Sequence, residues 1–125
     1  MSNLGHEEIL QADPRHFDAL QLLGTIEAQS GNKYIALELL NRALEINQSN
    51  PVVFNNHGNV LDDVGDYDAA LVSFNRALAL NPSYAEAYCN RAATHNRSHR
   101  YVEALEDYGR AIGLNPAYAD AFCNR

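Results

Sequence analysis

The sequence is poor in positive charge. Lysine and arginine together number 9, against 16 aspartates and glutamates, which gives a formal net charge of −7. A protein that follows nucleic-acid phosphates, or one that binds an anionic membrane surface, needs a basic face. We therefore expect neither nucleic acid nor a membrane among the partners of this chain.

Long apolar runs and a cysteine framework are also missing, and we expect no leader. The apolar runs are only a few residues long, far short of the roughly 20 residues that cross a bilayer, and residues 1–8 lack the basic start and apolar core of a signal peptide. The two cysteines, Cys89 and Cys123, are too few for a disulfide scaffold. We expect each to be a small, half-buried side chain and the protein to be cytoplasmic.

Motifs for catalysis, cofactors and metals are absent as well. The sequence has no phosphate-binding or dinucleotide-binding glycine loop and no Gly-x-Ser-x-Gly turn. His95 and His99 lie one helical turn apart but have no acidic residue between them, and Asp62, Asp63 and Asp66 lack the ligand series of a calcium loop. We expect no catalytic residue, no cofactor and no metal site, and so a protein that is not an enzyme.

The sequence does contain an internal repeat. Arg42, Arg76 and Arg110 open three similar blocks, each 34 residues after the last. Other positions that share this period are Ala36, Ala70 and Ala104; Leu40, Phe74 and Tyr108; Leu20, Phe54, Tyr88 and Phe122; and Gly24, Gly58 and Ala92. Agreement at so many positions is not coincidence, and a period of this length is typical of repeat arrays.

Each period predicts two helices. In residues 51–84, apolar residues from Phe54 onward recur three or four apart, on one helical face. A second amphipathic run follows Gly65 and ends at Pro82, because proline has no backbone donor and disfavours helical geometry in the residue before it. Small residues such as Gly58 allow the two helices to cross closely.

Residues 51–84 resemble the tetratricopeptide repeat. The family positions are occupied here by Phe54, His57, Gly58, Leu61, Ala70, Phe74, Ala77 and Pro82. The resemblance implies an all-α, right-handed superhelical solenoid of antiparallel helix-turn-helix units. It divides the chain into a first repeat at 17–50, a second at 51–84 and a third at 85–118. In the third repeat His99 replaces the turn glycine, so we expect a looser turn there.

The two ends look incomplete. Residues 1–16 resemble the remnant of a preceding repeat helix, and residues 119–125 resemble the start of a truncated further repeat. The apolar stripe that begins at Tyr118 has no partner helix. We expect either a fragment of a longer array or a small protein that completes its ends as a homo-oligomer or by exchange of terminal helices.

The resemblance also implies that the first helices line a concave groove. The candidate peptide-binding residues at the inward positions are Asn55, Asn56, Asn59, Asn90, Arg97 and Asn124. Asn56, Asn90 and Asn124 share one repeat position and should form a ladder. An amide offers donors and an acceptor that match a peptide backbone, but the same amides could instead bond neighbouring repeats. Nearby Asp62, Asp63, Glu86 and Asp120 favour a basic or neutral ligand.

We therefore expect a non-catalytic protein–protein interaction module that binds an extended peptide or protein segment. One alternative is an assembly module that oligomerises through its apolar ends. Another follows from residues 115–124 and the asparagine ladder, which resemble the superhelix of O-linked N-acetylglucosamine transferases and SPINDLY-like bacterial proteins. That resemblance implies a substrate-recognition fragment of such a glycosyltransferase.

Overall fold

The computed structural model describes residues 16–123, and in that range the chain forms seven α-helices and no strands. The helices are α2 (Phe17–Gln29), α3 (Lys33–Ile46), α4 (Pro51–Asp63), α5 (Tyr67–Leu80), α6 (Ala85–Arg97), α7 (Tyr101–Leu114) and α8 (Pro116–Cys123). The predicted all-α fold class is confirmed. The expected remnant at residues 1–16 lies, except for His16, outside the described residues.

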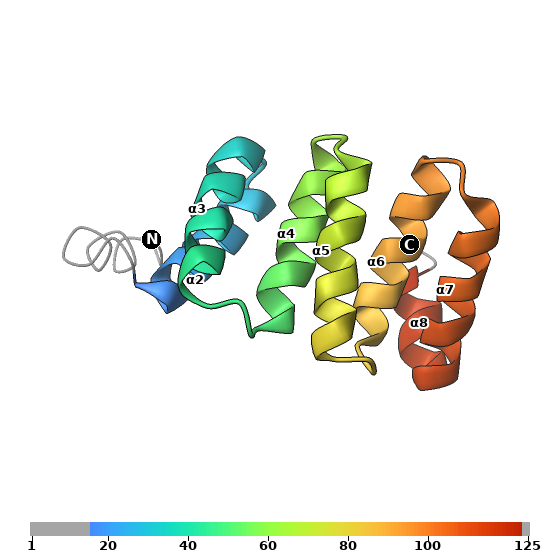
Figure 1. The fold of residues 1–125 in the computed structure, drawn as a ribbon. Helices are drawn as coiled ribbons and strands as arrows, with labels where there is room; N and C mark the ends of the chain where they lie inside the picture. The colour runs from blue at the N-terminus through green and yellow to red at the C-terminus, as the bar shows by residue number, and fades with distance from the viewer. Residues whose placement is uncertain (1–15, 124–125) are drawn as a thin grey trace.

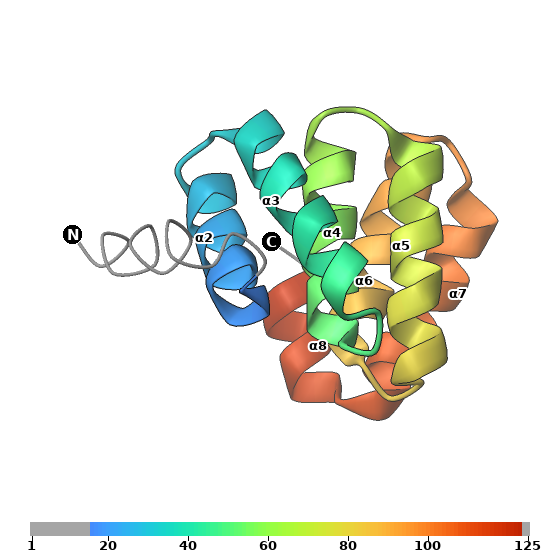
Figure 2. The same cartoon turned by 60° about the vertical axis from the view of Figure 1, so that its left-hand side comes forward.

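The helices form three antiparallel pairs, α2 with α3, α4 with α5 and α6 with α7, and α8 packs against the last pair (Figures 1 and 2). The first helices of successive pairs contact one another, whereas the described second helices α3, α5 and α7 do not. The stack therefore curves around its first helices, which line the inner face. None of the helices in the described range is long and apolar enough to cross a membrane.

Polar residues before several of the helices act as caps. The Asn50 side chain accepts a hydrogen bond from the Val52 N–H at 2.9 Å, ahead of a proline in the first turn of α4. Asn115 does the same for the Tyr118 N–H at 3.1 Å. As a result α8 begins at Pro116, earlier than the start at residue 119 that the repeat register predicts.

The turn of the third pair is as regular as the other two, so the expectation of a looser turn was wrong. His99 adopts a left-handed backbone conformation with φ of 63°, close to the 88° of Gly31 and the 87° of Gly65. The Arg100 N–H donates to the His95 carbonyl at 2.7 Å, as the equivalent residues do in the earlier turns. A left-handed non-glycine residue costs about 1–2 kcal/mol, and the surrounding pair imposes it.

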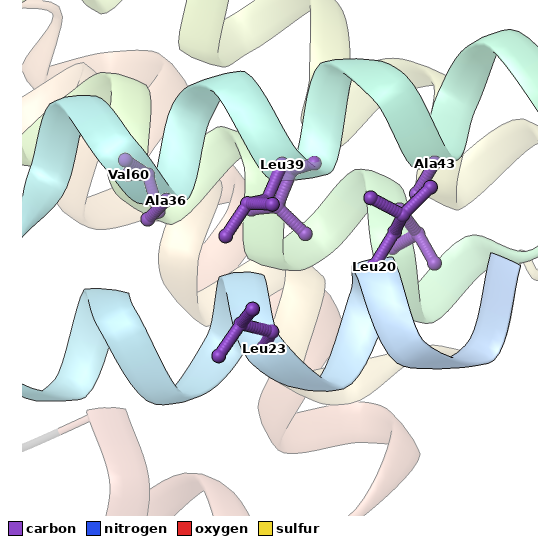
Figure 3. Close-up of a cluster of buried hydrophobic side chains, with 8 residues drawn as sticks. Leu20, Leu23, Ala36, Leu39, Ala43 and Val60 are labelled. Carbon is purple, nitrogen blue, oxygen red and sulfur yellow. The ribbon is translucent and has the colours of Figure 1, made fainter. Parts of the chain in front are cut away.

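The core is continuous from one pair to the next. Leu20 and Leu23 of α2 point toward Leu39 of α3, and Val60 of α4 joins the same cluster (Figure 3). All four side chains are buried. The first pair is therefore held to the second by the same apolar contacts that hold its own helices together.

The close crossing predicted from the small residues is confirmed. A Cβ atom on Gly58 would lie 2.6 Å from the ring of Phe74, which is fully buried. A Cβ atom on Gly24 would lie 3.0 Å from the Leu40 side chain. The absence of a side chain on the first helix thus makes room for a large one on the second.

The two cysteines form a disulfide, so the expectation of two separate thiols was wrong. Cys89 of α6 and Cys123 of α8 occupy the same position in successive first helices, with Cα atoms 5.3 Å apart. Such a bond limits the freedom of the unfolded chain. Disulfides persist mainly in oxidising compartments. This pairing therefore does not fit the expected cytoplasmic location.

Two glycine substitutions should have opposite effects. Gly58→Ala is expected to lower the free energy of unfolding by about 1–3 kcal/mol, because the buried Phe74 ring cannot move away. Gly109→Ala, at an exposed position in α7 with open space around it, should raise that free energy by up to about 1 kcal/mol. Urea unfolding of both variants checks this, and equal losses would contradict the steric account.

Candidate functional site

A cavity of about 460 Å³ opens on the inner face of the stack, and we call it the groove. Its wall is formed mainly by the first helices α2, α4 and α6. The amide side chains that line it are Gln29, Asn56, Asn59 and Asn90. The helical register that buries the apolar stripe of each first helix turns these polar residues toward the groove.

Asn56 and Asn90 each bond to the preceding pair. The Nδ2 atom of Asn56 donates to Thr25 Oγ1 at 3.3 Å, and that of Asn90 donates to Asn55 Oδ1 at 3.0 Å. Bonding between neighbouring repeats, one of the two roles expected for these amides, is therefore present. Among the described residues the Oδ1 atoms of Asn56 and Asn90 have no hydrogen-bond partner, so they remain available on the groove wall.

Asn55 does not line the groove. Its side chain is fully buried, and its Oδ1 atom accepts the bond from Asn90. The expectation that Asn55 lies on the binding surface therefore needs correcting. Asn55 supports the groove from behind by fixing the orientation of Asn90.

The remaining predicted residues differ in their surroundings. Asn59 lines the groove and has no hydrogen-bond partner in the described part of the chain. Arg97 also lines it, and its guanidinium forms an ion pair with Asp62, whose carboxylate accepts a second bond from Thr94 Oγ1 at 3.0 Å. Asn124 lies outside the described residues.

Carboxylates outnumber cations in and beside the groove. Asp62, Asp63 and Glu86 line it together with Arg97. The Lys33 ammonium lies at the rim, where Nζ donates to the Asp63 carbonyl oxygen at 3.4 Å. Just before the start of α6, burial raises the pKa of Tyr84 to about 12, and the charge of the nearby Glu86 adds to this shift.

A polar bridge that was not predicted from the sequence joins the second pair to the first. His57 Nδ1 lies 2.7 Å from Ser73 Oγ in its own pair, and Nε2 lies 2.7 Å from Asn41 Oδ1 in the preceding pair. Burial lowers the pKa of His57, which favours the neutral imidazole. That form can accept from Ser73 while it donates to Asn41.

Arg91 makes the equivalent bridge in the next pair. Its guanidinium donates to both carboxylate oxygens of Asp107, at 2.8 and 2.7 Å, and to Asn75 Oδ1 at 2.8 Å. The hydrogen bonds to Asp107 raise the pKa of Arg91. The signal in the sequence was a polar side chain at positions 57 and 91, where the first repeat has Leu23.

Asp107 is one of the residues that line a second, smaller cavity of about 230 Å³. Its carboxylate also contacts Arg110 at 2.9 Å and lies 3.7 Å from His95 Nε2. Burial lowers the pKa of His95 despite the nearby Asp107 charge. The opposite charges compensate one another inside the cluster, which fits a role in joining α6 to α7.

Comparison with known proteins identifies the repeat. Three family models, described as tetratricopeptide repeats, match residues 17–50, 58–98 and 85–118. Among curated proteins no sequence matches this chain.

Solved structures share the fold. A crystal structure of MamA is 24% identical with a TM-score of 0.88, and the match covers 93% of this chain and 68% of that one. YrrB, described as a TPR protein with an unusual peptide-binding site, is 28% identical with a TM-score of 0.84, at 91% and 59% coverage. The first TPR of Spaghetti (RPAP3), bound to the HSP90 peptide SRMEEVD, is 27% identical with a TM-score of 0.77, at 80% and 79% coverage. Against two further MamA structures the chain spans 63% and 66% of their length.

Two asparagines on the groove wall should differ in their effect on stability. Asn90→Ala is expected to lower the free energy of unfolding by about 1–2 kcal/mol, because it leaves the buried Asn55 Oδ1 without a donor. Asn59→Ala should raise it by a few tenths of a kcal/mol, since alanine is the better helix former. Urea unfolding measures both, and an unaffected Asn90→Ala would show that the bond to Asn55 contributes nothing.

Proposed function

Because the chain belongs to the tetratricopeptide repeat family, we propose that it is a non-catalytic interaction module that binds an extended peptide or protein segment in the groove. The proposal divides the chain into repeats at 17–50, 51–84 and 85–118, with partial units at either end. Repeat arrays of this kind act through the extended surface that their stacked units form together.

The observation that carries the proposal is the groove wall itself. Amides from α4 and α6 face one cavity, and the Oδ1 atoms of Asn56 and Asn90 and the whole amide of Asn59 remain available there. An extended segment presents N–H and C=O groups in alternation, and an asparagine amide can pair with either. A peptide-binding site in YrrB and a bound peptide in the RPAP3 repeat support the same use of this fold.

Asn59→Ala is the most direct test of binding, because it removes an available amide without breaking a bond of the array. Segments selected from a displayed library of random peptides should bind this variant at least about fivefold more weakly than the wild-type protein, as expected for the loss of about one hydrogen bond. Fluorescence anisotropy measures the affinities, and circular dichroism confirms equal helicity.

The control is Gln48→Ala, which removes an exposed amide between α3 and α4, away from the groove. It should leave the affinities unchanged. A library that yields no binding segment, or segments whose affinity responds to neither Asn59→Ala nor Asn56→Ala, would contradict binding in the groove.

Assembly through the C-terminal end is the second candidate, and one observation favours it. Leu105 and Ile112 of α7 are 71% and 52% exposed, whereas the equivalent Leu71 and Leu78 of α5 are 7% exposed each. In α5 the Leu78 side chain packs in a cluster with Ala87 of the pair that follows. A second copy of the chain that stacks on α7 would cover Leu105 and Ile112 in the same way.

For assembly, light scattering should show a mass that rises with protein concentration. Leu105→Glu combined with Ile112→Glu should hold the protein at the mass of one chain, because the stacking surface becomes charged. Val72→Glu, on an exposed part of α5, is the matched control and should still assemble. A wild-type protein that stays monomeric at every concentration would contradict assembly.

Substrate recognition for a glycosyltransferase is a finer form of the first proposal. It rests on the likeness of residues 115–124 and of the asparagine ladder to the arrays of those enzymes. Reading the gene beyond Arg125 decides it, because the proposal needs a catalytic domain in the same protein.

A further inference from the structure

One N–H donor of Asn56 and one of Asn90 are used in holding the array together. Asn90 and Asn56 each direct Nδ2 toward the preceding pair, to Asn55 Oδ1 and Thr25 Oγ1. In the described part of the chain each of these side chains leaves two atoms with free hydrogen-bonding capacity: Oδ1, which can accept two bonds, and Nδ2, which keeps one N–H. The two amides can therefore accept more hydrogen bonds from a ligand than they can donate.

The charges of the groove have the same bias. The guanidinium of Arg97 is paired with Asp62, and the two charges largely compensate. Asp63 and Glu86 also line the groove, and neither carboxylate forms an ion pair within the described residues. The Lys33 ammonium reaches only the Asp63 backbone carbonyl, so it leaves that carboxylate unpaired.

From these two observations we infer that the segment bound in the groove is cationic, with lysine or arginine side chains that reach Asp63 and Glu86. Its backbone N–H groups donate to the Oδ1 atoms of Asn56 and Asn90. This inference rests on the proposed function and specifies the chemistry of its ligand. An acidic segment is disfavoured, because its carboxylates would meet unpaired carboxylates and amide oxygens.

Three labelled peptides of equal length test the charge preference: alternating serine and lysine, alternating serine and glutamate, and serine alone. At low ionic strength the lysine peptide should bind about tenfold more tightly than the serine peptide, and the glutamate peptide most weakly. Added salt should reduce the difference, because the carboxylates are accessible to solvent and their field is screened. Fluorescence anisotropy gives the dissociation constants.

Two double variants with the same change in net charge locate the effect. Asp63→Asn with Glu86→Gln should weaken binding of the lysine peptide about tenfold, which removes its preference over the serine peptide, and by no more than about 25-fold, since each exposed ion pair contributes at most a factor of about five. Glu38→Gln with Glu45→Gln, at exposed positions of α3 outside the groove, should change it less than twofold.

The outcomes separate this inference from the proposed function. Binding that Asn59→Ala weakens, but that is equal for all three peptides or strongest for the glutamate peptide, overturns the charge preference and leaves the groove as a binding site. Equal losses in both double variants would assign the effect to net charge and also overturn the inference. If no peptide binds in a way that depends on Asn59, both proposals fail.

Discussion

One contact sets the geometry of the whole array: a glycine on one helix lies against a large side chain on the next. Because Gly58 lets the Phe74 ring lie against the backbone of α4, the two helices of this pair approach closely and cross at a fixed angle. Gly24 and Leu40 do the same in the first pair. Pairs built in this way stack with their first helices in contact and their second helices apart. The curvature that creates the groove follows from that difference.

Apolar packing alone would leave the stacking of the pairs poorly defined, and directional bonds define it further. His57 and Arg91 each connect a partner within their own pair to an asparagine of the preceding pair. The side chain of Asp107 is only 2% exposed, and it is paired with Arg91. Burying such a pair costs desolvation that its attraction barely offsets. Its main contribution is therefore to orientation, because an alternative register would leave the Asp107 charge buried and unpaired.

The helices and their pairing could be predicted because the patterns behind them are local: a period near 3.6 for each helix, and small residues where two helices cross. The groove side chains were predicted less well. Asn55 and Asn56 are neighbours separated by 100° of helical rotation, and that difference makes one buried and the other available. A sequence pattern locates a helical face only to about a third of the circumference. The Cys89 pairing was missed because it depends on how close α6 and α8 approach, which no local pattern reports.

The junctions between successive first helices are each cross-linked, and the link grows stronger along the chain. Between α2 and α4 it is a hydrogen bond from Asn56, and between α4 and α6 it is the Asn90–Asn55 bond reinforced by the Arg97–Asp62 ion pair. Between α6 and α8 it is the covalent Cys89–Cys123 bond. A covalent bond does not depend on packing, so among the described junctions the one between α6 and α8 is held most firmly.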